Sequence, residues 1–243
     1  MRRSTKRLMD EHELILQTID SMGTMADSAS ARGEVDEPFW RDAIDFIRNF
    51  ADGLHHQKEE GQLFEMYSRR GLSREYGPVA VMLNEHVMGR DCVSRMEAAV
   101  ANQSPDQLAR AARDYCELLT QHIAKENQIL FPLGETVLSD SDEIELNIRF
   151  DEAELELGGT SNTLRYRELA ASLAEHAAFV APAFSDAPKD ANRHAFSEHA
   201  DFEHIHVEMR PLSRPAGSVV ESLFDAWIWL DNPTQYNSYT TDS

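Results

Sequence analysis

One ten-residue pattern occurs twice in the chain, and it constrains the fold more than any other feature. The two copies read HHQKEEGQLF at residues 55–64 and HIAKENQILF at residues 122–131. In each copy a histidine is followed four positions later by a glutamate, and a Leu-Phe pair comes next. Residues four apart lie on one face of an α-helix. Each copy therefore predicts a helix carrying an imidazole beside a carboxylate, and we call these pairs, His55/Glu59 and His122/Glu126, the two clamps.

A shorter echo precedes each clamp. Glu11-His12 lies upstream of the first clamp and Glu85-His86 upstream of the second, and each follows an apolar-rich turn. The order is thus a single histidine and then a clamp, written twice. This repetition predicts two helical hairpins of the same design.

Apolar periodicity and helix-end signals predict four long helices. They cover residues 5–25, from about 38 to 71, 77–101 and from 104 to about 134. Ser104-Pro105 is a strong helix start, and Pro132 with Gly134 is expected to close the fourth helix. The fold class is therefore all-α, an up-down-up-down four-helix bundle. With 1.5 Å of rise per residue, both clamps and both single histidines fall at one level of this bundle.

The chain beyond the bundle divides into two parts. Residues 140–157 are acidic but keep Ile144, Ile148 and Leu155 at helical spacing, which predicts a short amphipathic helix, and another is expected over 164–178. We expect three regions: a bundle over 1–139, a helical extension over 140–178 and an acidic tail over 179–243, partly ordered at best, with a short helix at 219–227.

Composition excludes several partners. The formal net charge of −20 argues against a nucleic-acid backbone or an anionic membrane surface as a partner. The basic start lacks an uninterrupted apolar segment, and no stretch reaches the ~20 apolar residues of a membrane span. Cys92 and Cys116 are too few for a disulfide scaffold and are expected to be inert, reduced core thiols. These features predict a cytoplasmic protein whose acidic tail is a candidate surface for a protein partner.

The inward-facing residues of such a bundle need a compensating ligand. Unpaired buried imidazoles and carboxylates each cost several kcal/mol, and a divalent metal removes that cost. Imidazole with carboxylate and no thiolate suits iron, manganese or zinc. Six ligands are too many for one structural zinc but suit two ions that share carboxylates. The candidate metal ligands are His12, His55, Glu59, His86, His122 and Glu126.

The chain resembles the hemerythrin-like proteins with a His-His-Glu cation-binding domain. The resemblance extends over roughly residues 5–174 and rests on GPVAVMLNEH at 77–86 and on the His122/Glu126 clamp followed by Leu-Phe-Pro. It implies a pair of iron ions with an oxo or hydroxo bridge, held by the four histidines as terminal ligands and by Glu59 and Glu126 as bridging ligands. It also implies a small diatomic molecule or peroxide as the ligand.

Two departures from the oxygen-carrying members matter. Those proteins have a fifth histidine one turn after the third ligand, where this chain has Arg90, and a longer His-to-Asp spacing in place of His122/Glu126. Arginine offers no acceptor and cannot bind a metal. Unless Glu60, His56 or Glu85 substitutes, the centre lacks one ligand. The function is then open between binding of dioxygen or a reactive oxygen or nitrogen species, an enzyme that decomposes peroxide or reduces nitric oxide, and an iron- or oxygen-sensing regulatory module.

The neighbours of the ligands have simpler expectations. His56 and Glu60 are expected to face solvent or to support a ligand from outside, with direct ligation as the alternative. Glu11 and Glu85 either orient an imidazole or lie on the surface. The later histidines are expected to form a polar appendage and no second metal site; they are His176, His194, His199, His204 and His206.

Overall fold

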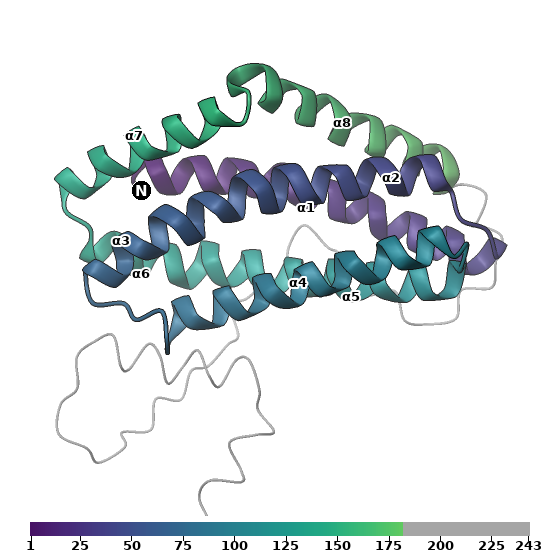
Figure 1. Cartoon of the computed structure of the whole chain (residues 1–243), viewed down its shortest axis with the longest axis horizontal. Helices are drawn as coiled ribbons and strands as arrows, with labels where there is room; N and C mark the ends of the chain where they lie inside the picture. Colours follow the sequence, from purple (N-terminus) through teal and green to yellow (C-terminus); the bar gives the residue numbers. More distant parts are fainter. Residues whose placement is uncertain (182–243) are drawn as a thin grey trace, which may run out of the picture. The chain divides into compact units, whose positions relative to one another are not determined.

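The computed structural model of the chain describes residues 1–181, and this part is helical apart from short connections (Figure 1). Its elements are α1 Arg3–Arg32, α2 Glu37–Phe46, η1 Ile47–His56, η2 Glu59–Leu63, α3 Phe64–Arg69, α4 Pro78–Ala101, α5 Pro105–Lys125, η3 Glu126–Leu130, α6 Phe131–Val137, α7 Asp140–Glu156 and α8 Gly159–Val180. The elements labelled η are π-helical, with hydrogen bonds from residue i to i+5.

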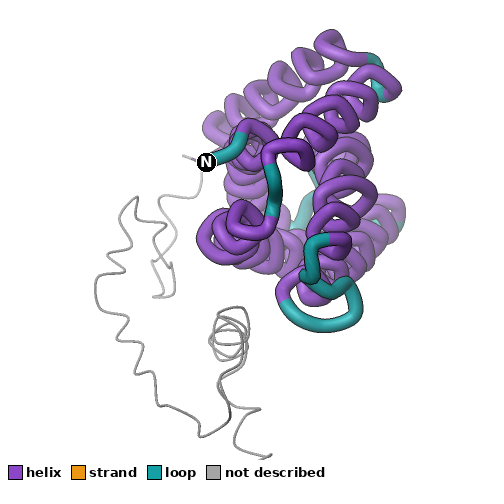
Figure 2. The backbone as a smooth tube through the Cα atoms, turned by 90° about the vertical axis from the view of Figure 1, so that its left-hand side faces the viewer, coloured by secondary structure: helices purple, strands orange, loops and turns teal. Residues whose placement is uncertain are grey.

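Four rods make the bundle. The first is α1, the second runs without a break from α2 through η1 and η2 to α3, the third is α4, and the fourth runs from α5 through η3 to α6. α1 packs on α5, α5 on α4, and both α1 and α4 contact η1. Figure 2 looks along the rods and shows them around a common interior. The predicted all-α four-helix bundle is confirmed.

The extension forms an additional layer on one side of the bundle. In Figure 1, α7 and α8 lie over α1 and the second rod, with α7 contacting α1 and η2, and α8 contacting α1 and α2. The break between them occurs at Gly158, whose φ of 101° lies in the left-handed region that favours glycine. The layer buries Tyr166 of α8 against Phe46 and Phe50 of the second rod.

The two ends of the bundle differ in what fills them. Large apolar side chains, Trp40 and Phe46 among them, fill the end covered by α8. At the other end α3 and α6 approach so closely that the ring of Tyr67 occupies the place where a Cβ of Gly134 would lie, only 2.0 Å away. Gly134 is therefore needed for this contact and does not end the helix.

Two predicted helix ends are wrong. The first helix continues past residue 25 to Arg32, because the small residues Ser28 and Ala29 pack inside the bundle and do not form a loop. The fourth rod continues to Val137, because Pro132 occupies the first turn of α6, where its missing N–H is tolerated after the π segment.

The extension helices are present, but the predicted buried face of the first is wrong. Ile144, Ile148 and Leu155 are 64%, 53% and 75% exposed. The buried apolar residues of α7 are Leu146, Phe150 and Ala153. The next helix begins at Gly159 and not at 164. The predicted helix at 219–227 and nearly all of the expected tail lie outside the described residues, and the proposed region boundaries stay a prediction.

Candidate metal centre

The six candidate ligands come from all four rods and meet in the interior. His12 is on α1, His86 on α4 and His122 on α5, whereas Glu59 and Glu126 each begin a π segment and His55 lies near the end of one. Every one of these side chains is at most 1% exposed. The prediction that they share one level of the bundle is therefore correct. Their role as metal ligands stays a prediction.

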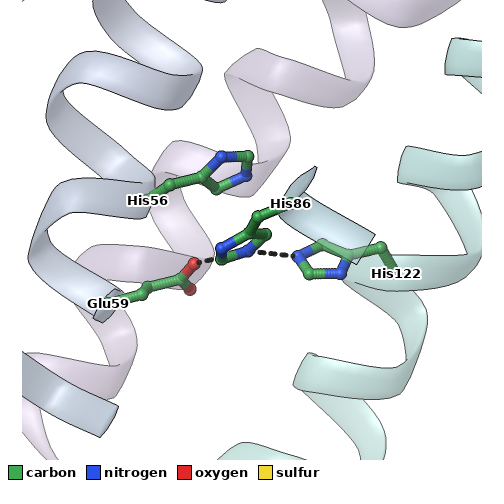
Figure 3. Close-up of side chains that lie close together, drawn as sticks. All are labelled: His56, Glu59, His86 and His122. Carbon is green, nitrogen blue, oxygen red and sulfur yellow. Dashed lines mark hydrogen bonds and ion pairs between the residues drawn. The ribbon is translucent and has the colours of Figure 1, made fainter. Parts of the chain in front are cut away.

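The inward-facing side chains form two overlapping clusters. One contains His12, His55, Glu59 and Glu126, and the other contains His56, Glu59, His86 and His122 (Figure 3). Within each cluster one nitrogen or oxygen of every residue lies within 4.8 Å of the others. Glu59 belongs to both: Oε1 is 3.4 Å from His55 Nε2 and Oε2 is 3.6 Å from His86 Nε2. Glu126 Oε2 lies 3.2 Å from His12 Nε2 and 3.3 Å from His122 Nε2.

Both clamps are built on wide helical turns. His55 is the last residue but one of the π segment η1, Glu59 opens η2, and Glu126 opens η3. Short π segments inside longer helices occur frequently at functional sites. The same deviation thus accompanies the same motif in both halves of the bundle.

The outer nitrogen of each imidazole is held by an oxygen. The Nδ1 partners are Asn127 Oδ1 for His12 (2.8 Å), Glu11 Oε2 for His55 (2.9 Å), Asp52 Oδ1 for His56 (3.2 Å), Glu60 Oε1 for His86 (2.8 Å) and Glu85 Oε2 for His122 (2.8 Å). Carboxylate and amide oxygens accept hydrogen bonds, so each Nδ1 carries the proton. Each Nε2 then presents a lone pair, and in metal sites this arrangement fixes the tautomer and orientation of a histidine ligand.

Two lysines anchor these carboxylates. Lys58, fully buried, binds Glu11 and lies 3.2 Å from Glu154 of α7. Lys125 binds Glu85 in the corresponding place of the second half. Of the two alternatives for Glu11 and Glu85, the structure supports the one in which they orient imidazoles: Glu11 binds His55 and Glu85 binds His122, and neither binds the histidine beside it in sequence.

The electrostatics of the interior favour a cation. Burial, followed by the neighbouring Glu126, raises the pKa of Glu59 well above its ordinary value. Burial also lowers the pKa of His55 and His86 well below the ordinary value, assisted by adjacent imidazoles. Metals bind histidine as the neutral imidazole and glutamate as the ionised carboxylate, so a bound cation would offset the cost of ionising Glu59 beside Glu126.

Several inward-facing atoms lack a hydrogen-bond partner within the described part of the chain. They are His12 Nε2, both oxygens of Glu59 and both oxygens of Glu126. His86 Nε2 and His122 Nε2 also face each other at 3.1 Å, although both present lone pairs. Buried acceptors without donors are costly. A pair of divalent cations would satisfy all of them, so this donor set fits the group that the fold implies.

The family model for the hemerythrin HHE cation-binding domain matches residues 3–134, which include all six candidate ligands. The chain belongs to this family. The predicted resemblance is thereby confirmed.

Matches to curated proteins are short. A segment of 38 residues is 60% identical to the 6-oxocyclohex-1-ene-1-carbonyl-CoA hydrolase of Geobacter metallireducens, covering 16% of this chain and 10% of that protein. A 35-residue segment is 63% identical to the hydrolase of the same name from Syntrophus aciditrophicus, covering 14% and 9%. The chain thus spans about a tenth of the length of these relatives. No solved structure matches the chain.

The structure corrects one expectation about the ligand neighbours. His56 does not face solvent: it is 4% exposed and belongs to the second cluster. Glu60 supports His86 from outside, as one of the alternatives allowed. Lys58, Lys125 and Asn127 were not anticipated, although the lysine at the same position of both clamps was a signal that could have revealed them.

The remaining predicted residues lie elsewhere. His176 lies on α8, and its Nε2 is 2.7 Å from Asp36 Oδ2, away from the centre. The later histidines lie beyond residue 181. Cys92 and Cys116 are free thiols, and burial raises the pKa of Cys116 to about 12. None of the helices between residues 1 and 181 is apolar over a length that would cross a bilayer.

Proposed function

We propose that this chain is a non-haem di-iron protein that binds dioxygen or a reactive oxygen or nitrogen species. The observation that supports this most directly is the pair of clusters joined by Glu59, whose inward-facing oxygens have no hydrogen-bond partner among the described residues. Two adjoining clusters with a shared carboxylate are suited to two ions rather than one.

The donor chemistry supports iron. The clusters contain imidazole and carboxylate and no thiolate, a set that suits iron and manganese and is too large for a single four-coordinate zinc. Bound iron would supply open coordination positions and a reversible change of oxidation state. The chain itself contributes the fixed tautomers of its histidines, because every Nδ1 is bound by an oxygen.

The adjoining pocket supports a small ligand. A pocket of about 160 Å³ reaches His56 and His86, and its wall includes Arg90 and Tyr115. The hydroxyl of Tyr115 is buried and has no hydrogen-bond partner in the described region. A space of this size admits a diatomic molecule or peroxide with a few waters.

Iron loading tests the proposal. The protein would be loaded with ferrous iron without air, desalted, assayed for iron per chain, and then exposed to oxygen while the visible spectrum is recorded. We expect two irons per chain and a charge-transfer band that is reversible on removal of oxygen. Substoichiometric iron that zinc displaces would contradict the proposal and make the clamps structural.

The second candidate is an enzyme that decomposes peroxide on the same centre. It is favoured by Tyr115, which lines the pocket and whose buried hydroxyl has no hydrogen-bond partner among the described residues, because this phenol can donate a hydrogen bond to peroxide. Turnover of peroxide by the iron-loaded protein, lowered in Tyr115→Phe with iron content unchanged, would select this candidate. Irreversible oxidation with no turnover in either protein would remove it.

A further inference from the structure

We propose that His56 supplies a fifth imidazole to the centre, in place of the histidine that oxygen-carrying relatives have at the position of Arg90. This inference rests on the proposed function and assigns a ligand outside the six predicted ones. It concerns the cluster of His56, Glu59, His86 and His122.

The position of His56 matches that of a ligand. Its side chain is 5% exposed, and its ring stacks on that of His86 with centroids 3.8 Å apart and planes inclined by 16°. Figure 3 shows the two rings one above the other, with His122 and Glu59 on either side of His86. One nitrogen of His56 lies within 4.8 Å of donor atoms from all three neighbours.

His56 is also oriented in the same way as the other four imidazoles. Its Nδ1 lies 3.2 Å from Asp52 Oδ1, which also accepts a hydrogen bond from Arg90 Nε at 2.9 Å. Arg90 in turn lies 2.6 Å from Glu60 Oε1, the oxygen that holds His86. The arginine therefore fixes both carboxylates that orient the imidazoles on this side. The two helices therefore exchange roles. α4, which carries the fifth histidine in oxygen-carrying relatives, here carries Arg90, and η1 on the second rod supplies the imidazole of His56.

The second clamp shows that packing alone does not require a histidine here. The residue equivalent to His56 is Ile123, which is 2% exposed and part of the apolar core. A buried imidazole where the repeated design uses isoleucine costs desolvation unless it gains a specific partner. One cluster then offers three imidazoles and the shared Glu59, and the other offers two imidazoles with both carboxylates.

The test compares wild type with His56→Ile. This variant introduces the residue that the second clamp has at the equivalent position, Ile123, so the site stays filled by a buried side chain. Each protein is loaded with ferrous iron without air, oxidised, and dialysed against a graded series of a chelator. Iron per chain and the ferric absorption spectrum are then recorded. His176→Ala, a surface histidine on α8, is the matched control and should behave as wild type.

We expect His56→Ile to lose one of the two irons at a chelator concentration at least about tenfold lower than wild type, with a changed spectrum. The metal-free His56→Ile protein should show the circular dichroism and urea unfolding of wild type, which rules out misfolding as the cause. Two irons in His56→Ile with wild-type chelator resistance and spectrum would overturn the inference and leave the di-iron proposal intact. Wild type that binds no iron would overturn the di-iron proposal itself.

Discussion

The two halves of the bundle contain the same arrangement of histidine, glutamate and lysine in different surroundings. In each half a glutamate next to a single histidine, Glu11 or Glu85, accepts a hydrogen bond from the clamp histidine. The same glutamate binds the lysine that lies three residues after that clamp histidine. In the first half that lysine is fully buried under α7, where it also reaches Glu154 and the ring of Phe150. In the second half the side chain of Lys125 is 14% exposed. The repeat therefore specifies the centre, and the extension seals one side of it.

The halves also differ at two positions next to the clamp glutamates and histidines. His56 and Glu60 of the first half correspond to Ile123 and Asn127 of the second. Glu60 and Asn127 have equivalent roles, because each accepts a hydrogen bond from the single histidine of the other half. Glu60 binds His86, and Asn127 binds His12. The exchange of His56 for Ile123 is different in kind, since His56 adds an imidazole to the second cluster and lines the pocket. A nearly symmetric scaffold thus yields two unlike clusters of candidate ligands.

The largest expected effect separates the two carboxylates that we predict to bridge the metal ions. Glu59 belongs to both clusters and Glu126 to one. Glu59→Ala should therefore abolish iron binding at both positions, whereas Glu126→Ala should abolish the dinuclear centre and leave at most one iron. Iron analysis after desalting measures this, with His204→Ala as a variant expected to keep its iron. Full iron retention in either glutamate variant would refute the ligand assignment.

Next comes the contrast between the two lysines. Lys58→Met leaves Glu11 and Glu154 without their shared cation under α7, and loss of one partner of a buried pair costs about 3–5 kcal/mol. Lys125→Met should cost less, about 1–2 kcal/mol, because solvent reaches that pair. Urea unfolding of the metal-free proteins followed by circular dichroism gives both values. Equal losses would mean that the cover of α7 is immaterial.

A smaller effect concerns the attachment of α7. Asp142 caps this helix with Ser139 and accepts from Arg70 of the loop after α3 at 2.7 Å, and these contacts lower the pKa of its carboxyl. A lowered pKa in the folded state means that the stabilisation is complete above the unfolded value near 3.8 and disappears as the pH falls through the folded value. Asp142→Asn should cost about 1 kcal/mol at pH 7, as loss of a cap does.

The measurement for Asp142 is the unfolding free energy of both proteins from pH 7 down to the lowest pH at which they fold. The difference between them should shrink below about pH 4. A difference that stays constant over this range would show that the carboxylate charge contributes nothing.

The smallest effect concerns the thiols, which occur in the second half alone. Burial raises the pKa of Cys116 to about 12 and also raises that of Cys92. Both should react with a thiol reagent at pH 8 far more slowly in the folded protein than in urea, since the thiolate is the reactive form. Fast labelling of the folded protein would show that the second half opens.

The sequence was sufficient for the features that depend on local spacing. A spacing of four positions from His to Glu places both on one helix face, and the repetition of the pattern predicts the bundle and brings all six candidate ligands together. Helix ends were less predictable. Pro132 looked like a terminator, yet it sits in the first turn of α6 after a π segment that no spacing rule announces.

Features that depend on packing against distant segments could not be read from the sequence. Ile144, Ile148 and Leu155 have helical spacing, but α7 turns Leu146 and Phe150 toward the bundle instead. The sequence predicted a surface position for His56, because His55 and not His56 aligns with His122 when the Leu-Phe pairs of the two copies are superposed. Its burial depends on the facing α4 and on Asp52 with Arg90, which no local pattern reports.

The π segments have a consequence for chain length. A π turn closes with one residue more than an α turn, so the helix between a clamp and its Leu-Phe pair holds a residue that an uninterrupted α-helix would not need. Deleting one residue within Glu59–Leu63 or Glu126–Leu130 would leave a continuous helix. The residues beyond the deletion would face nearly the same way as before, because the wide turn absorbs the extra residue, whereas a deletion in a regular α-helix with 3.6 residues per turn would rotate them by about 100°. Phe64, Tyr67 and Phe131 would still face the interior, so each half can lose a residue at its π segment without turning these side chains outward.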